Sequence, residues 1–351
     1  MYTTNSTFDS YGTTVFELMS RLAVEHKSIN LGQGFPDDHG PNAVLQKASE
    51  YLFDTPNQYP PMLGIPELRQ AVAAHNKRFY DLDIDWKTET MVSSGATEGL
   101  AACFLGLLNQ GDEVVVIEPL YDCYLPMIER AGGIPKRVSI EPPDWKLNGS
   151  ALRAAFSNKT KLVLINSPQN PSSKVYHREE LLLIADLVKE HDAIAICDEV
   201  YEHMVYDHRQ HVPLMTLPGM RDRSIRIGSA GKTFSLTGWK VGYLTGSEEL
   251  LKAVSKAHQF LVFTTPPNLQ RAVADGLNGD GTYFERLNID MRSKRNRLAE
   301  GLSKISGFNP IACQGTYFLF VDVENVGFSD TDINFCKYLT TEVGVTGVPV
   351  S

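Results

Sequence analysis

Ile225-Arg-Ile-Gly-Ser-Ala-Gly-Lys232 is a short apolar run that ends in small residues and a lysine. The chain continues as Thr233-Phe-Ser-Leu-Thr-Gly-Trp-Lys240, which brings a second lysine. A short apolar run is typical of a strand that is buried on both faces of a sheet. Small residues at its end let a flat ligand approach the backbone closely, and a lysine amine can attack carbonyls. The segment therefore predicts a buried strand that delivers Lys232 to a ligand site.

Three further apolar runs repeat this design along the chain. They are residues 114–117, 162–165 and 193–197, and each leads into a cluster of polar residues. Helical patterns such as residues 178–190 lie between the runs. Alternating strands and helices predict a large α/β domain in which helices flank a mainly parallel sheet. Because ligands bind beyond the carboxyl ends of the strands in such sheets, the polar clusters mark the expected site.

Length and composition restrict the class of protein. A chain of 351 residues is long enough for about two domains, and 21% charged residues are typical of a soluble globular protein. The net charge of −9 argues against nucleic acid or an anionic membrane as a partner. The five cysteines have no metal-ligand spacing, which predicts reduced thiols and no metal site. Since the N-terminus lacks the order of a signal peptide, we predict a cytoplasmic protein.

The C-terminal part of the chain has a different pattern. Residues 315–323 are typical of a strand and residues 331–343 of a helix, which predicts a smaller α+β domain. We therefore expect an N-terminal arm that also contributes to the small domain (1–41), a large domain (42–275) and a C-terminal small domain (276–351). The strand-like ending has no closing helix after it, so we expect this small domain to be incomplete.

A glycine turn precedes another helical pattern in Ser93-Ser-Gly-Ala-Thr-Glu-Gly99. Free backbone N–H groups at the start of a helix bind anions. Taken alone, such a turn is more often only the beginning of a helix. Ser229 and Lys240 can supply further donors to the same anion, so together they predict a phosphate site.

Polar side chains at the ends of the other strands suit an aromatic nitrogen ring. Asp198 follows a buried strand, where a carboxylate can pair with a protonated ring nitrogen or simply cap the next helix. Tyr201 and Asn170 can donate hydrogen bonds to an oxygen on the ring, and Tyr121 can lie against its face. Each residue alone is more often structural, but their joint occurrence at successive strand ends favours a phosphorylated pyridine cofactor.

These residues stand in motifs that resemble the pyridoxal-phosphate aminotransferases of fold type I, which share the aspartate-aminotransferase-like fold. The motifs are Ser94-Gly-Ala-Thr97, Glu118-Pro-Leu-Tyr121, Asn166-Ser-Pro-Gln-Asn-Pro171, Cys197-Asp-Glu-Val-Tyr201 and Ser229-Ala-Gly-Lys232. Residues 118–124 and 229–242 are similar to the branch that contains kynurenine, glutamine and methionine aminotransferases. The resemblance extends from about residue 29 to residue 351.

The resemblance implies a role for each residue. Lys232, Asp198 and Tyr201 would be the catalytic residues, with Lys232 forming the Schiff base to pyridoxal 5′-phosphate. The residues expected to hold the phosphate are Ala96, Thr97, Ser229 and Lys240, together with Tyr59 reaching from the second subunit of a homodimer. Around the ring, Tyr121 would stack on its face, Asn170 and Tyr201 would bond its hydroxyl oxygen, and Asp198 would bond its nitrogen. Gly34 and Asn170 would lie beside the substrate.

The implied activity is the transfer of an amino group from an aromatic, sulfur-containing or glutamine-like amino acid to a 2-oxo acid. A carbon–sulfur β-lyase acting on cysteine conjugates would use the same lysine, so this alternative stays open. The sequence departs from the family at Ser172-Ser173, where Thr-Gly is common, because a non-glycine residue limits positive φ. It also ends before an arginine that binds the substrate carboxylate in relatives, so a catalytically impaired fragment that still binds cofactor is a third alternative.

Two rival motifs are incomplete in this chain. Gly231-Lys-Thr233 resembles the end of a phosphate-binding loop of nucleotide hydrolases, but Arg226 occupies the position of its first glycine. Ser229-Ala-Gly-Lys232 fits the serine-x-x-lysine pattern of penicillin-binding enzymes, whose partner motifs Ser-Asp-Asn and Lys-Thr-Gly do not occur in the sequence. Both rival functions are therefore disfavoured.

Overall fold

A seven-stranded sheet in the order β2-β8-β7-β6-β5-β3-β4 forms the centre of the computed structural model, which describes residues 4–350. Its strands are β2 (Thr90–Ser93), β3 (Glu113–Glu118), β4 (Ile134–Ser139), β5 (Thr160–Asn166), β6 (Ile194–Asp198), β7 (Ser224–Ser229) and β8 (Gly242–Thr245). Only β8 runs antiparallel to its neighbours in this sheet. The predicted mainly parallel sheet, with strands at the four apolar runs, is confirmed.

Alternating side chains of the strands build a core on each face of this sheet. Val115 and Ile117 pack with α8 (Arg178–Glu190), whereas Val114 and Val116 pack with α5 (Gly95–Leu107). Complete burial of such a side chain contributes about 1.5–3 kcal/mol. The first face also carries α7 (Gly149–Ala155), and the second carries α6 (Tyr124–Arg130) and α10 (Glu248–Leu261). Apolar residues facing both ways explain why the strand sequences do not alternate with polar residues.

A third core lies at the β2–β8 edge of the sheet. There α3 (Asn42–Asp54), α4 (Pro66–Tyr80) and α11 (Pro267–Leu277) enclose apolar side chains from both strands. Shorter helical turns join the main elements: α1 (Ser6–Asp9), η1 (Leu214–Thr216), α9 (Ala230–Thr233) and η2 (Thr237–Trp239). Within residues 4–350, no helix has both the length and the apolar character needed to cross a membrane.

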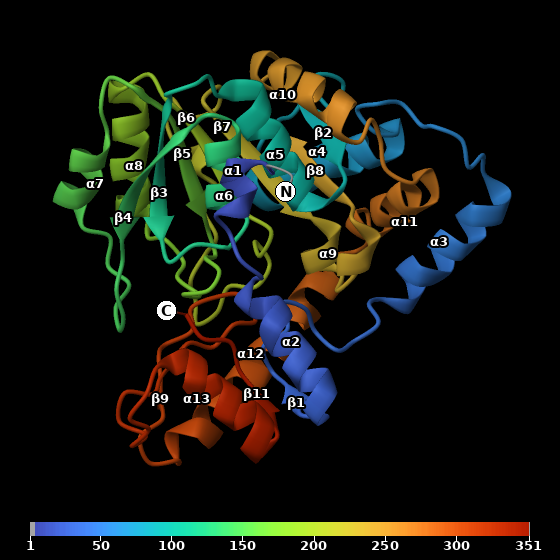
Figure 1. Ribbon diagram of the computed structural model, residues 1–351. Coiled ribbons are helices and arrows are strands. Elements are labelled where there is room, and N and C mark those ends of the chain that lie inside the picture. The colour runs from blue at the N-terminus through green and yellow to red at the C-terminus, as the bar shows by residue number, and fades with distance from the viewer. Residues whose placement is uncertain (1–3, 351) are drawn as a thin grey trace.

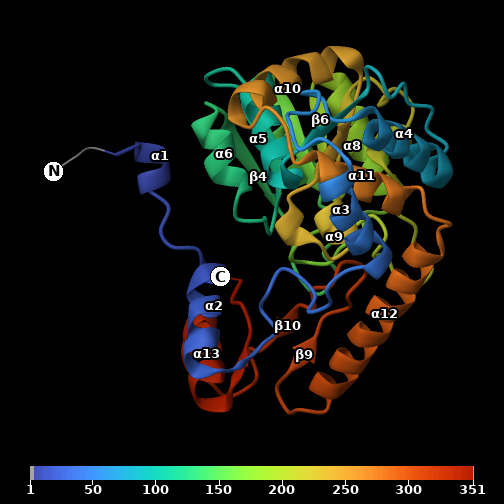
Figure 2. The same ribbon diagram turned by 90° about the vertical axis from the view of Figure 1, so that its right-hand side faces the viewer.

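The N-terminal and C-terminal segments come together below the sheet, where Figure 1 shows α2 (Val15–His26) beside α13 (Asp332–Tyr338). Parallel pairing joins β1 (Ile29–Asn30) to β11 (Val345–Thr346). The long helix α12 (Thr282–Ser303) connects the upper and lower parts of the molecule (Figure 2). A short antiparallel pair, β9 (Asn309–Pro310) and β10 (Val321–Asp322), completes the smaller α+β part. The structure thus contains both parts of the expected fold.

The secondary structure of this smaller part was predicted only in part. The helix expected at residues 331–343 is confirmed, as α13 followed by the π-helix η3 (Leu339–Val343). The strand expected at residues 315–323 is wrong except for β10. Thr316 has a φ of 63°, which breaks the extended conformation, and its N–H donates to the carbonyl of Met204. Contact with another loop thus overrides the local strand pattern.

Candidate active site

A cavity of about 410 Å³ lies where the carboxyl ends of β5, β6 and β7 meet the beginning of α5. Nearly all of the residues predicted for the site line it: Gly34, Ala96, Thr97, Tyr121, Asn170, Asp198, Tyr201, Ser229, Lys232 and Lys240. Parallel strands bring these distant segments to one edge of the sheet. Tyr59 is the predicted residue that does not line the cavity.

Lys232 projects into the cavity from α9, the short helix that directly follows β7. Its Nζ donates hydrogen bonds to the carbonyl of Gly34 and to the hydroxyl of Tyr317, both at 2.9 Å. The ring centroids of Tyr201 and Tyr317 lie 5.7 and 5.6 Å from the same nitrogen. The amine is therefore held in one position by acceptors and aromatic faces from three separate segments.

Asp198 ends β6 and is 5% exposed. Its Oδ2 accepts a hydrogen bond from the Tyr124 hydroxyl at 2.6 Å, whereas its buried Oδ1 has no partner among the described residues. Burial raises the pKa of this carboxyl to about 6, although the hydrogen bond from Tyr124 and the charge of Lys232 oppose the rise. A buried oxygen without a partner is costly. A ligand that donates a proton at this position would satisfy it.

The loop after β5 is joined to Asp198 through backbone contacts. Asn166 donates from Nδ2 to the Asp198 carbonyl at 2.9 Å, and its Oδ1 accepts the N–H of Asn170 at 2.7 Å. Ser173, at the position where the sequence departs from the family that it resembles, has a φ of 61°. The loop therefore adopts the left-handed conformation with serine in place of glycine, and Ser173 Oγ donates to the carbonyl of Ser172 at 2.5 Å.

The beginning of α5 lies beside the amine of Lys240. Ser94, the N-cap residue, makes no side-chain cap, so N–H groups of the first turn remain available. Gly95 has a φ of +77°, and a Cβ built on it would lie 3.3 Å from the Lys240 Nζ. This closeness brings the ammonium group next to the positive end of the helix dipole. Ala96, Thr97 and Ser229 line the same cavity.

Tyr59 lies on the surface, with 84% of its area exposed. Its ring meets that of Phe263 edge-on, with the centroids 5.6 Å apart. The structure describes one chain, so the contact of Tyr59 with a second subunit stays a prediction.

Several residues of the cavity were not identified from the sequence. Tyr124 belongs to the motif at residues 118–124, and its spacing of three residues from Tyr121 was a usable signal because a single turn joins the two. Tyr317, which is bonded to Lys232 but is not itself a lining residue, belongs to the segment that was expected to be a strand. Other unpredicted lining residues are Phe16, Phe35 and Phe318. Their place depends on how α2 and the C-terminal part pack against the sheet.

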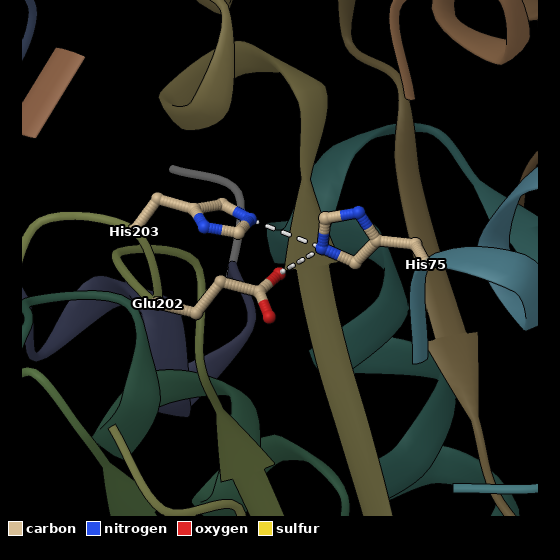
Figure 3. Close-up of side chains that lie close together, drawn as sticks. All are labelled: His75, Glu202 and His203. Atoms are coloured by element: carbon tan, nitrogen blue, oxygen red, sulfur yellow. Dashed lines mark hydrogen bonds and ion pairs between the residues drawn. The ribbon is translucent and has the colours of Figure 1, made fainter. Parts of the chain in front are cut away.

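A second cluster of titratable groups lies outside the cavity, where Figure 3 shows His75 and His203 facing each other beside Glu202. Each offers one possible metal ligand, and these atoms lie within 4.8 Å of one another. The two Nε2 atoms are 3.0 Å apart, a hydrogen-bond distance in which one ring donates to the other. Burial lowers the pKa of His203 to about 3, which keeps this ring neutral. We therefore assign the cluster to a buried hydrogen-bond network.

Arg226 extends this network from β7. Its Nε donates to Glu199 Oε2 at 2.6 Å and its Nη2 to Glu202 Oε2 at 2.9 Å. The guanidinium carbon lies 4.5 Å from the ring centroid of Tyr80. Because Glu199 directly follows Asp198, the network supports the loop that carries the Asp198 carboxylate.

Comparison with known proteins shows which family the chain is similar to. A family model described as aminotransferase class I and II matches residues 26–351. The chain is 42% identical over 343 residues to a probable N-succinyldiaminopimelate aminotransferase of Mycobacterium tuberculosis, covering 97% of this chain and 86% of that protein. It is 38% identical over 377 residues to a kynurenine–oxoglutarate transaminase of Dictyostelium discoideum, covering 97% of this chain and 86% of that protein. A solved Escherichia coli structure, described with a methionine aminotransferase function, has a TM-score of 0.95 at 36% identity and covers 100% of this chain and 91% of that chain.

Proposed function

We infer the finer function of this chain from one established premise: it belongs to the aminotransferase class I and II family and is a pyridoxal-phosphate-dependent aminotransferase. We propose that its amino donor is an aromatic, sulfur-containing or glutamine-like amino acid and that its acceptor is a 2-oxo acid. The observation that carries this proposal is the aromatic lining of the cavity by Phe16, Phe35 and Phe318. Aromatic rings and thioethers both make favourable contacts with such a lining.

The cavity fits the cofactor at both of its charged ends. The buried Asp198 Oδ1, which has no hydrogen-bond partner in the part of the chain that the structure describes, suits a protonated ring nitrogen. At the other end, the first turn of α5 with Lys240 suits a phosphate. We assign the phosphate to Ala96, Thr97, Ser229 and Lys240. We assign the face of the ring to Tyr121, and its hydroxyl oxygen to Asn170 and Tyr201.

The proposed mechanism gives each end of the site a separate task. When bound, pyridoxal phosphate supplies an aldehyde that reacts with amines and a ring that withdraws electrons. Lys232 supplies the nucleophilic amine and, once the substrate has released it, moves the proton at the substrate Cα as general base and acid. Asp198 keeps the ring nitrogen protonated. Gly34 and Asn170 lie beside the substrate and orient it.

The substrate proposal is tested with the full chain and a panel of amino donors. We expect methionine, glutamine or kynurenine to give a kcat/KM at least tenfold above that of N-succinyldiaminopimelate, the substrate in the name of one relative. Product 2-oxo acids are measured by chromatography with several acceptors. A clear preference for N-succinyldiaminopimelate would overturn the assignment.

A carbon–sulfur β-lyase is the second candidate, because Lys232 would remove the same proton. Cysteine conjugates distinguish the two outcomes. Transamination yields the corresponding 2-oxo acid and an aminated acceptor, whereas β-elimination yields pyruvate, ammonia and a thiol. Quantifying pyruvate and ammonia against the 2-oxo acid therefore gives the balance between both activities.

Replacing Asp198 by asparagine is expected to slow proton removal roughly 10²–10³-fold, because a preorganised charge is lost beside the ring. Asparagine keeps the shape of the side chain, so the fold should be retained. The measurement is the rate of Cα deuterium exchange in single turnover with excess enzyme. A rate within a factor of two of the wild type would rule out the assigned role of Asp198.

Tyr317 is expected to assist Lys232, because its hydroxyl accepts a hydrogen bond from the amine. Tyr317→Phe should reduce kcat/KM about tenfold, which corresponds to the loss of about 1.4 kcal/mol. Steady-state kinetics provide the measurement, and Tyr338→Phe, at a residue 46% exposed on α13, is the matched control. Equal kcat/KM values for Tyr317→Phe and the wild type would show that the contact does not contribute.

We further propose a homodimer in which Tyr59 reaches the cofactor phosphate of the partner. Tyr59 and Phe260 are 84% and 85% exposed, and the Tyr59 ring packs on Phe263 in the same surface region. Large exposed apolar side chains of this kind are typical of a protein interface.

Tyr59→Phe should therefore weaken pyridoxal phosphate binding about tenfold while leaving the affinity for pyridoxal, which has no phosphate, unchanged. Equilibrium dialysis measures both affinities, and analytical ultracentrifugation measures the oligomeric state. A monomer with full cofactor affinity would contradict this model.

A further inference from the structure

We propose that Tyr124 is a positioning residue that holds one oxygen of Asp198 and thereby directs the other oxygen to the ring nitrogen of the cofactor. The inference rests on the proposed role of Asp198 and adds a residue that the family motif assignments do not include. Tyr124 is among the residues that line the cavity, and its hydroxyl is bonded to Asp198. We therefore expect it to act on the cofactor through that carboxylate.

Three observations about Tyr124 carry the proposal. It is the first residue of α6 and is 1% exposed, so its ring has little freedom to move. Its hydroxyl donates to Asp198 Oδ2 at 2.6 Å, a short distance typical of a hydrogen bond to a charged oxygen. Asp198 Oδ1 is left buried and without a partner among residues 4–350, and Asp198 lines the cavity. The two carboxylate oxygens thus have separate tasks.

The turn that leads into α6 also places Tyr121, because the Tyr124 N–H donates to the Tyr121 carbonyl at 3.2 Å. The rings of Tyr121 and Tyr124 meet edge-on, with centroids 5.7 Å apart and an interplanar angle of 83°. Since Tyr121 lines the cavity where we place the face of the cofactor ring, one segment would set both the plane of the ring and the partner of its nitrogen. The spacing of three residues between the two tyrosines brings them to the same side of the turn.

The hydrogen bond from Tyr124 affects the charge of the Asp198 carboxyl as well as its orientation. Burial favours the neutral acid, and the hydrogen bond from Tyr124 favours the carboxylate. The titratable or charged groups near the Asp198 carboxyl are Tyr121, Cys123 and Tyr124 before α6 and in it, Cys197 in β6, Glu199 and Tyr201 after β6, and Lys232 in α9. Removing the Tyr124 hydroxyl should raise the pH at which Asp198 loses its charge.

A purely structural role is the alternative, because a buried tyrosine also fills space. Tyr124→Phe separates the two roles, since it keeps the ring and removes only the hydroxyl. The chain offers a matched control in Tyr176, which is 2% exposed, has no hydrogen-bond partner for its hydroxyl among the described residues and lies in the core on the opposite face of the sheet. Tyr176→Phe changes the same atoms far from Asp198.

The experiment measures cofactor affinity of the apoprotein between pH 5 and pH 8 by equilibrium dialysis. The phosphate monoester of the cofactor also titrates near pH 6. The contribution of Asp198 is therefore taken as the difference in cofactor affinity between each protein and the Asp198→Asn variant at the same pH. For the wild type this difference should disappear as the pH falls through about 6 and Asp198 becomes protonated. In Tyr124→Phe the midpoint should lie at least half a pH unit higher, and the affinity at pH 7 should fall about threefold to tenfold.

A cofactor analogue without the ring nitrogen, 1-deazapyridoxal phosphate, tests the direction of the carboxylate. Its affinity should be equal in the wild type, Tyr124→Phe and Tyr176→Phe. An unchanged midpoint in Tyr124→Phe, or an equal loss of affinity for both cofactors, would overturn the positioning role. If the wild type and Asp198→Asn have the same pH profile, the proposed function of Asp198 fails instead, so the two failures are distinguishable.

Discussion

Lys232→Ala is expected to reduce kcat by at least about 10⁴-fold, because one side chain supplies both the nucleophile and the proton carrier. The structure gives the amine a fixed position, with hydrogen bonds of 2.9 Å to Gly34 and Tyr317. The amine of Lys240 lies beside Gly95 at the beginning of α5, where it faces the proposed phosphate. It should therefore not replace Lys232. Cofactor binding should persist in the variant through the phosphate site and Asp198.

Two measurements test this prediction. Steady-state and single-turnover rates give the loss of activity, and borohydride reduction of the loaded wild type followed by peptide mapping should find the cofactor attached to Lys232. Lys252→Ala, at an exposed position of α10, is the matched control and should retain activity. Label on Lys240, or substantial turnover by Lys232→Ala, would refute the mechanism.

The sheet was predictable because its strands are buried on both faces. Runs such as residues 162–165 are apolar at every position, and this is possible only where both faces of a strand are covered. The parallel order then brings Asn170, Asp198 and Lys232 to one edge, although they are far apart in sequence. Most of the proposed cofactor site follows from this single property of the sheet.

The contacts of Tyr317 could not be predicted in the same way. Its partners Lys232 and Gly34 lie 85 and 283 residues away in sequence. The pattern of residues 315–323 predicted a strand. The chain does not form that strand at Thr316, because the Thr316 N–H donates to the carbonyl of Met204 in another loop. Such residues are defined by the packing of the N-terminal and C-terminal segments against the sheet. Local pattern contains no information on that packing.

Arg226 is another residue whose role depends on packing and could not be predicted from the sequence pattern. It lies between Ile225 and Ile227 in β7, and in the sequence it served only to exclude a nucleotide-binding loop. The structure shows a 5% exposed guanidinium that neutralises two buried carboxylates, Glu199 and Glu202. Burial raises the pKa of each carboxyl, but Arg226 and nearby histidines outweigh this effect and hold both pKa values below the usual range.

Arg226→Met should therefore reduce the free energy of unfolding by about 3–5 kcal/mol at neutral pH, because it leaves two buried carboxylates without their cation. The sign of the pH dependence follows from the lowered pKa values. The wild type gains stability from Glu199 and Glu202 above their ordinary pKa and loses it as the pH falls. The variant instead carries uncompensated charge at neutral pH, and protonation relieves it, so the difference between the two proteins should shrink in acid.

Urea unfolding at pH 7 and pH 5 measures both effects, with Arg153→Met as the control, since its ion pair with Glu190 is exposed and contributes at most about 1 kcal/mol. Adding Glu199→Gln and Glu202→Gln to Arg226→Met should recover part of the loss, because the buried charges disappear together with their partner. If Arg226→Met is no less stable than Arg153→Met, the network does not stabilise the fold. The loop that carries Asp198 would then be held by its backbone and by Asn166 and Tyr124.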